Sequence, residues 1–274
     1  MLIDYHLHNH FSPDSEEDTR KIVKKAISLG IQEICLTNHL EIHDRITKKS
    51  VFDLDEATER FKAIREDIAE VQRDYPQLPI RFGTELEYIE GRMEEVARFV
   101  KKTPFDFIVG SVHIVLGVII SSHLFAGELY EKTDEETAYN AYFDNLAAMV
   151  EWGHFDAVAH FDICKKIGCK FYSPFQPERY KHRIIPILKR MKEKGIGLEL
   201  NSGSFEKYCM ELYPHPLILE WAIEAGIENF TTGSDAHKEK RVSKHIAESL
   251  EIAKKAGIKN ISTYTGRVPT RHSI

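Results

Sequence analysis

Short apolar runs alternate with longer amphipathic stretches along the chain. The runs are rich in Ile, Val, Leu and Phe, and they predict buried strands at residues 1–8, 31–36, 80–85, 105–113, 155–162, 197–201 and 228–232. Between them, apolar residues recur every three or four positions, which predicts helices at residues 15–30, 53–73, 93–102, 134–152, 184–194, 216–225 and 241–256. A capping-box pattern at residues 15–18 opens the first helix and Gly30 closes it.

About seven strand–helix units in succession predict a parallel sheet, either open and doubly wound or closed into a barrel. Polar residues follow nearly every expected strand, whereas an open sheet concentrates its site at one switch point. We therefore expect an α/β fold, a distorted seven-stranded (β/α)7 barrel that forms a single domain over residues 1–274. Residues 114–133 interrupt the alternation, and we expect them to form a loop over the site. A short strand is expected near Ile261.

Composition and charge mainly exclude classes of function. The 274 residues carry a net charge of −6 with acids and bases interspersed, so no basic field attracts a nucleic-acid backbone. No apolar run reaches membrane-spanning length and the first residues read as a strand rather than a signal peptide, so we expect a cytoplasmic protein without a membrane partner. The four cysteines form no CxxC pair, which predicts reduced thiols. The oligomeric state stays open.

The first motif with chemical content is Asp4-x-His6-x-His8, at the end of the first apolar run. Side chains alternate along a strand, so these three point to the same side. Two imidazoles at this spacing can hold one divalent ion. On this motif alone, an equally good reading is a pair of hydrogen-bonded histidines inside the barrel.

The same pattern recurs along the chain, because a metal-ligating residue stands at the end of strand after strand. In a barrel the carboxyl ends of the strands meet at one rim. Histidine nitrogens combined with carboxylate oxygens suit Zn, Mn or Fe, and the set exceeds what one tetrahedral site can use, so two or three divalent ions are expected. The candidate ligands are His6, His8, Asp14, His39, Glu85, His113, His160, Asp235 and His237.

These ordered motifs resemble the polymerase and histidinol phosphatase (PHP) superfamily, whose opening motif is Asp-x-His-x-His. The histidinol-phosphate phosphatase branch is the most similar. A departure is Asn38, where relatives commonly carry an acid, and this affects the surroundings of the ligands rather than the ligands themselves. The resemblance continues through Thr37-Asn38-His39, Gly83-Thr-Glu85, Gly110-Ser-Val-His113, His160-Phe-Asp162, Glu199-Leu-Asn201 and Gly233-Ser-Asp235-Ala-His237.

The resemblance implies a distorted (β/α)7 barrel with a trinuclear metal site. It implies that Glu85 bridges two ions. The first ion would be held by His6, His8, Glu85 and Asp235, the second by Glu85, His113 and His160, and the third by Asp14, His39 and His237. How the ligands divide between the second and third ions stays open.

By the same resemblance, we expect a metal-dependent phosphomonoesterase that hydrolyses L-histidinol phosphate, the step before histidinol oxidation in histidine synthesis. A hydroxide that bridges two ions would attack phosphorus. Asp162 or His182 is a candidate proton donor to the leaving group. Lys165 and Arg183 are candidate phosphate partners, and for these two a solvated surface charge is an equally good reading.

Two other functions stay possible. One is another phosphoesterase of this superfamily, such as a nucleotide phosphatase or an exonuclease, although the net charge of −6 argues against a strand-binding groove. The other is a metal-bound module without turnover. All the ligand positions are filled, which argues against a degenerate module.

Overall fold

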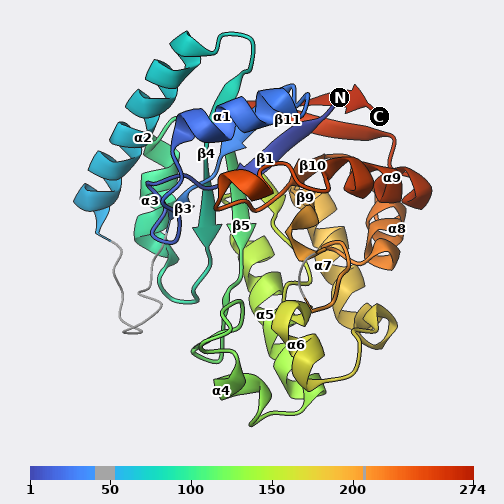
Figure 1. Ribbon diagram of the computed structural model, residues 1–274. Coiled ribbons are helices and arrows are strands. Elements are labelled where there is room, and N and C mark those ends of the chain that lie inside the picture. Colours follow the sequence, from blue (N-terminus) through green and yellow to red (C-terminus); the bar gives the residue numbers. More distant parts are fainter. Residues whose placement is uncertain (41–52, 206–207) are drawn as a thin grey trace.

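The computed structural model describes residues 1–40, 53–205 and 208–274. In these residues, seven parallel strands form the sheet at the centre of the molecule (Figure 1). Their order in the sheet is also their order in the sequence. The strands are β1 (Ile3–Leu7), β2 (Glu33–Leu36), β4 (Ile80–Glu87), β5 (Phe107–Ser111), β8 (Ala157–Val158), β9 (Gly197–Asn201) and β10 (Phe230–Gly233).

Contacts between the first and last strands close this sheet into a barrel. The backbone N–H of His8 donates to the carbonyl of Ala236 at 3.0 Å, and the N–H of Asp235 donates to the carbonyl of His6 at 2.9 Å. A short strand, β3 (His39–Leu40), pairs with β4 and sets His39 opposite Glu85. The predicted seven-stranded barrel is therefore confirmed, and three of the candidate ligands, His6, His8 and Asp235, belong to its closing seam.

Helices cover the outside of the barrel because their apolar stripes pack on the strands (Figure 1). Asp53 and Asp134 cap the predicted second and fourth helices through their carboxylates. None of the helices in the described ranges combines the length and the apolar character needed to cross a membrane. The helices are α1 (Thr19–Ser28), α2 (Leu54–Asp74), α3 (Met93–Lys102), α5 (Glu135–Trp152), α7 (Lys181–Lys194), α8 (Pro216–Glu224) and α9 (Ile246–Ala256).

Three helix starts differ from the prediction, and the first is that of α7, which begins at Lys181 rather than at residue 184. Asp18, not Ser15, caps α1, since the Ser15 hydroxyl donates instead to the carbonyls of His8 and His237, both at 3.1 Å. The last helix begins at Ile246 rather than at residue 241, after a 3-10 turn, η3 (Glu239–Arg241). Ser243 prevents an earlier start of this helix, because its N–H and its hydroxyl both donate to the carboxylate of Asp4, at 3.0 and 2.9 Å.

The strand predicted at residues 155–162 is also shorter than expected. Regular pairing ends at Val158, and His160 has a φ of 27° that turns the chain out of the sheet. Its N–H donates to the Glu199 carboxylate at 2.8 Å instead of to a neighbouring strand. The side chain of Glu199, on the neighbouring strand β9, therefore ends β8.

Residues 114–133 do contain local structure. They form a small hairpin from β6 (Ile114–Val115) and β7 (Val118–Ile119), followed by a short helix, α4 (Gly127–Tyr130). The polar and aromatic stretch after residue 163 contains a helix, α6 (Lys165–Phe171), and a 3-10 turn, η1 (Pro177–Tyr180). A second such turn, η2 (Ser202–Ser204), follows β9.

A C-terminal hairpin covers the end of the barrel where the strands begin. It consists of β11 (Asn260–Thr265) and β12 (Val268–Ser273), so the strand predicted near Ile261 is confirmed. Tyr264 N–H donates to the hydroxyl of Tyr5 at 2.9 Å, and Arg267 pairs with Asp156 at 3.0 Å. Because this end is covered, the opposite rim is the one available for a site.

Candidate metal centre

The rim at the carboxyl ends of the strands gathers all the candidate ligands into one cluster, called here the ligand cluster. Its members come from the ends of β1, β3, β4, β5, β8 and β10, and one comes from the loop after β1. Most of the side chains are buried. The cluster comprises His6, His8, Asp14, His39, Glu85, His113, His160, Asp235 and His237.

Glu85 lies at the centre of the cluster, and its two oxygens face different histidines. Oε1 lies 3.0 Å from His160 Nε2 and 3.4 Å from His113 Nε2. Oε2 lies 3.1 Å from His6 Nε2 and 3.0 Å from His39 Nδ1. These imidazoles lower the pKa of Glu85 well below its ordinary value, although burial acts to raise it. One carboxylate is thus placed between two sets of nitrogen ligands.

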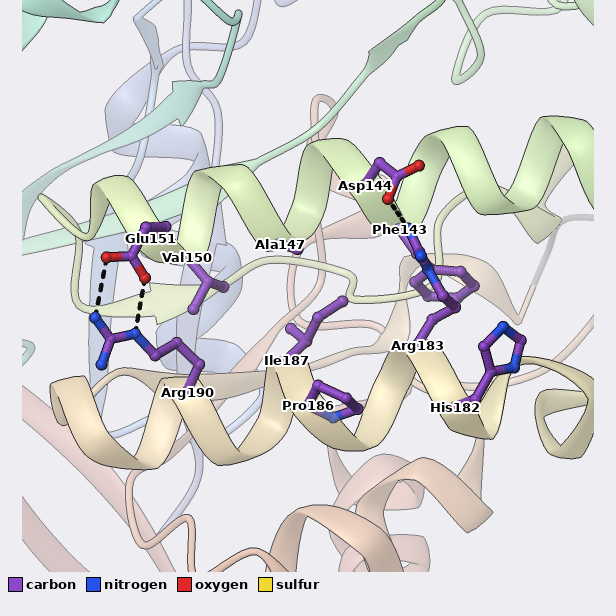
Figure 2. Close-up of a pocket in the computed structure, with 10 residues that line it drawn as sticks. All are labelled: Phe143, Asp144, Ala147, Val150, Glu151, His182, Arg183, Pro186, Ile187 and Arg190. Carbon is purple, nitrogen blue, oxygen red and sulfur yellow. Dashed lines mark hydrogen bonds and ion pairs between the residues drawn. The ribbon is translucent and has the colours of Figure 1, made fainter.

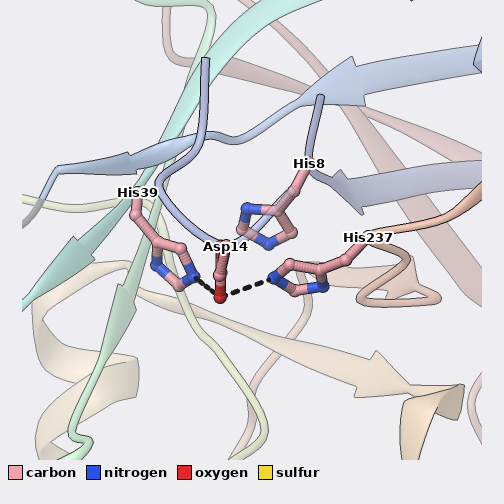
Figure 3. Close-up of side chains that lie close together, drawn as sticks. All are labelled: His8, Asp14, His39 and His237. Atoms are coloured by element: carbon pink, nitrogen blue, oxygen red, sulfur yellow. Dashed lines mark ion pairs between the residues drawn. The ribbon is translucent and has the colours of Figure 1, made fainter. Parts of the chain in front are cut away.

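Asp14 organises the outer part of the cluster (Figure 3). Its Oδ2 lies 3.1 Å from His237 Nε2 and 3.4 Å from His39 Nε2. The ring of His8 stacks on that of His237 with 4.1 Å between centroids. Burial acts to raise the pKa of Asp14, but the two histidines outweigh it and lower the pKa well below the ordinary value. These four side chains converge closely enough to hold one ion.

Residues behind the cluster fix the orientation of its histidines. Glu199 Oε1 lies 2.6 Å from His6 Nδ1, which leaves Nε2 to face the cluster. Ser12 Oγ lies 3.1 Å from His8 Nδ1 and has the same effect there. Sequence reasoning noted the Glu199 motif without giving it a role, and it missed Ser12. Such supporting partners commonly set both the tautomer and the basicity of a metal-binding histidine.

Gly233 leaves the space that the Glu199 carboxylate occupies. A Cβ at this position would lie 2.1 Å from Glu199 Oε1 and 2.5 Å from His6 Cβ. The glycine of the Gly-Ser-Asp-Ala-His motif is therefore required by close packing. Asp4, the first residue of the opening motif, supports the same loop, since its carboxylate accepts from the N–H and the hydroxyl of Ser234 at 2.9 and 2.6 Å.

The donor atoms of the cluster fit metal ions. His6 Nε2, His8 Nε2 and Glu85 Oε2 are buried and form no hydrogen bond within the described residues, although Glu85 Oε2 lies close to His6 Nε2 and His39 Nδ1. Burial and the neighbouring His237 and His39 lower the pKa of His8 to about 3, so its imidazole is neutral, as a ligand must be. Buried polar atoms without partners are costly, and a bound cation removes that cost.

A pocket of about 370 Å³ opens directly above the cluster. Part of its lining comes from the insertion at residues 114–133, which confirms that the insertion lies over the site. Lys166 and His123 also line the pocket, and neither was among the predicted site residues. A volume of this size suits a small ligand, since such pockets span roughly 300–1,000 Å³.

Comparisons with known proteins show the family to which this chain belongs. The model of the PHP domain family matches residues 4–203. The chain belongs to the PHP domain family. The histidinol-phosphatase of Lactococcus lactis is 28% identical over 96% of this chain and 94% of its own length, and a probable histidinol-phosphatase of Deinococcus radiodurans is 25% identical over 95% and 96%.

Solved structures show the same architecture as this PHP domain. Histidinol phosphate phosphatase (HisK) from Lactococcus lactis, complexed with zinc, L-histidinol and phosphate, matches with a TM-score of 0.83 and 25% identity over 98% of both chains. A putative histidinol phosphatase from Listeria monocytogenes matches with a TM-score of 0.76 and 24% identity over 90% of this chain and 99% of its own. The second match supports the fold alone.

Two predicted site residues of the PHP domain lie on its outer surface. His182 and Arg183 line a groove between α5 and α7, and Arg183 pairs with Asp144 on α5 (Figure 2). None of the residues lining this groove belongs to the pocket above the ligand cluster. The predictions of a proton donor at His182 and a phosphate partner at Arg183 are therefore corrected, because the apolar face of α7 packs inward and turns both side chains away.

Asp162 and Lys165 form a buried ion pair beside the site rather than lining the pocket. Lys165 Nζ lies 2.8 Å from Asp162 Oδ2 and 3.2 Å from Glu211 Oε2, and both members of the buried pair have side chains with 0% exposure. Asp162 Oδ2 also accepts from the N–H of His215 at 2.9 Å. Asp162 therefore binds an ammonium and a backbone N–H through Oδ2 and does not line the pocket, and Lys165 is held by acids away from it, so neither predicted role is carried forward.

This arrangement predicts a structural role for Lys165. Lys165→Met should lower the free energy of unfolding by about 3–5 kcal/mol, because it leaves the buried Asp162 carboxylate without its counter-charge. Urea unfolding followed by circular dichroism measures this. The double variant Asp162→Asn/Lys165→Met removes both charges and should recover much of the loss. Unchanged stability with a large rise in KM would instead indicate a substrate contact.

Proposed function

We propose that this protein is a metal-dependent phosphomonoesterase that hydrolyses L-histidinol phosphate to L-histidinol and phosphate. The observation that carries the proposal is the position of Glu85, a buried carboxylate whose two oxygens face separate histidine sets at the floor of a small-ligand pocket. The named relatives, which match nearly the full length of the chain, support the choice of substrate.

The geometry supports a division of the cluster among three ions. His6 and His8 each have one nitrogen occupied, by Glu199 and Ser12, so each can give only Nε2 to one ion. We assign them with Asp235 to the first ion. Glu85 would contribute to the first ion and, with His113 and His160, to the second. Asp14, His39 and His237 would hold the third.

When bound, divalent ions there would lower the pKa of a water molecule to provide a nucleophile and would neutralise the phosphate charge. The chain supplies the framework for this chemistry. Glu85 fixes the spacing between ligand sets, and Glu199 holds His6 in the productive orientation. Lys166, which lines the same pocket, offers a positive charge for phosphate oxygens. Most of the ligands at the pocket floor are buried, which limits their contact with bulk water.

A panel of phosphate esters tests the substrate. We expect kcat/KM for L-histidinol phosphate to exceed that for p-nitrophenyl phosphate by about a hundredfold or more, because a pocket that pairs the amine and imidazole rejects an ester lacking them by about tenfold for each group. Steady-state kinetics with the metal-loaded protein measure it. Faster turnover of nucleotide 3′- or 5′-phosphates, or of a single-stranded oligonucleotide, would move the assignment to another phosphoesterase.

A further inference from the structure

The pocket has an outer wall that contributes no candidate metal ligand. The buried ligand cluster forms the pocket floor, so the alcohol part of a phosphate ester held there has to extend away from the floor and along this wall. The wall carries hydroxyls, an imidazole, a cation and apolar groups. It consists of Ser121, Ser122, His123, Leu124, Ile163 and Lys166.

His123 stands out on this wall because a second aromatic ring contacts it. Its imidazole meets the ring of Tyr208 edge-on, with 5.5 Å between centroids and an interplanar angle of 76°. Tyr208 belongs to the segment that follows β9, far from His123 in sequence. The ammonium of Lys170 lies 5.8 Å from the centre of the same tyrosine ring. The ring contact thus joins the insertion to the segment that follows β9.

The segment that carries Tyr208 is anchored to α6. The buried Lys165 pairs with Glu211 at 3.2 Å and donates to the carbonyl of Leu212 at 3.0 Å. Tyr208 itself is 54% exposed, which is high for a large aromatic side chain. Tyr208 is thus an exposed ring on an anchored segment, in contact with a residue that lines the pocket, and a ligand ring can add to such an aromatic contact.

We propose that His123, positioned by Tyr208, selects the alcohol part of the substrate by contacting its heteroaromatic ring. An imidazole can pair with another imidazole, since each neutral ring has one donor and one acceptor nitrogen. Lys166 on the same wall is a cation, so it suits the phosphate rather than a charged amine or the ring. The inference rests on the proposed phosphatase function and assigns the recognition of one part of its substrate.

The test compares two esters that differ in the ring. L-histidinol phosphate carries an imidazole and an amine, whereas O-phosphoethanolamine carries only the amine. His123→Ala should lower kcat/KM for histidinol phosphate by about tenfold, mainly by raising KM. It should change kcat/KM for O-phosphoethanolamine by less than about twofold. Tyr208→Ala should show a smaller loss of the same kind. Tyr208→Phe keeps the ring contact and should behave as the unchanged protein.

A matched control is His154→Ala. His154 is also an exposed histidine with an aromatic neighbour, Trp152, at 4.7 Å between centroids, but it precedes β8 at the opposite end of the barrel. His154→Ala should leave kcat/KM for both esters unchanged. If the unchanged protein hydrolyses neither ester, the phosphatase proposal itself fails. A different outcome is that the unchanged protein prefers histidinol phosphate while His123→Ala lowers kcat/KM for both esters equally. In that case the phosphatase proposal stands and the recognition role of His123 is overturned.

Discussion

Replacing Glu85 with Gln should lower kcat by about a thousandfold or more. The loss of one preorganised electrostatic contact already costs roughly a hundredfold to a thousandfold, and this carboxylate faces two ligand sets at once. The amide keeps the size of the side chain but loses its charge and one acceptor. It therefore weakens the contacts that now run at 3.0 to 3.4 Å from both oxygens to His160, His113, His6 and His39.

The matched comparison is His237→Asn, which changes a ligand in the outer part of the cluster. His237 contacts Asp14 at 3.1 Å, and among the described residues it forms no ion pair with Glu85. We expect kcat of the His237→Asn variant to fall by about tenfold to a hundredfold, which is the usual range when a residue that supports a metal site is changed. Steady-state kinetics and elemental analysis on the same samples measure both effects. Equal losses of kcat with metal content intact would argue against a bridging role for Glu85.

Removal of metal should abolish activity, and readdition should restore it. A phosphate ester hydrolyses extremely slowly without help, and within the described residues the pocket floor offers metal ligands rather than a nucleophilic Ser or Cys. We expect about three transition ions per chain after loosely bound ions are removed, because each of three ligand sets can complete one site. Mass spectrometry of the metals, before and after chelation, measures the number.

Readdition of metal to the chelated protein also tests the identity of the ions. Zn, Mn and Fe all suit a set of imidazole nitrogens and carboxylate oxygens. Adding each metal to the chelated protein, one at a time, shows which restores turnover of histidinol phosphate. Full activity with a single ion per chain would contradict the trinuclear assignment, and full activity in metal-free protein would contradict the mechanism as a whole.

The sequence alone was enough to predict the barrel and the members of the ligand cluster. Each signal is local, because an apolar run marks a strand and the polar residue after it marks the strand end. Parallel strands carry those ends to one rim, so residues as distant as His6 and His237 could be placed together without coordinates. Helix ends such as Asp53 and Asp134 were predictable for the same reason, since a cap acts within one turn.

The tertiary structure decided which side chains support the cluster and which reach the pocket. Glu199 and Ser12 bind ring nitrogens from positions that no local spacing connects to His6 and His8. Lys165 and Lys166 are adjacent in sequence, yet one is buried against Asp162 and the other lines the pocket. Neighbours on a helix point about 100° apart, so their roles depend on what packs on each face of α6. The residues that pack on the Lys165 face of α6 lie in the segment after β9, which is far from α6 along the chain.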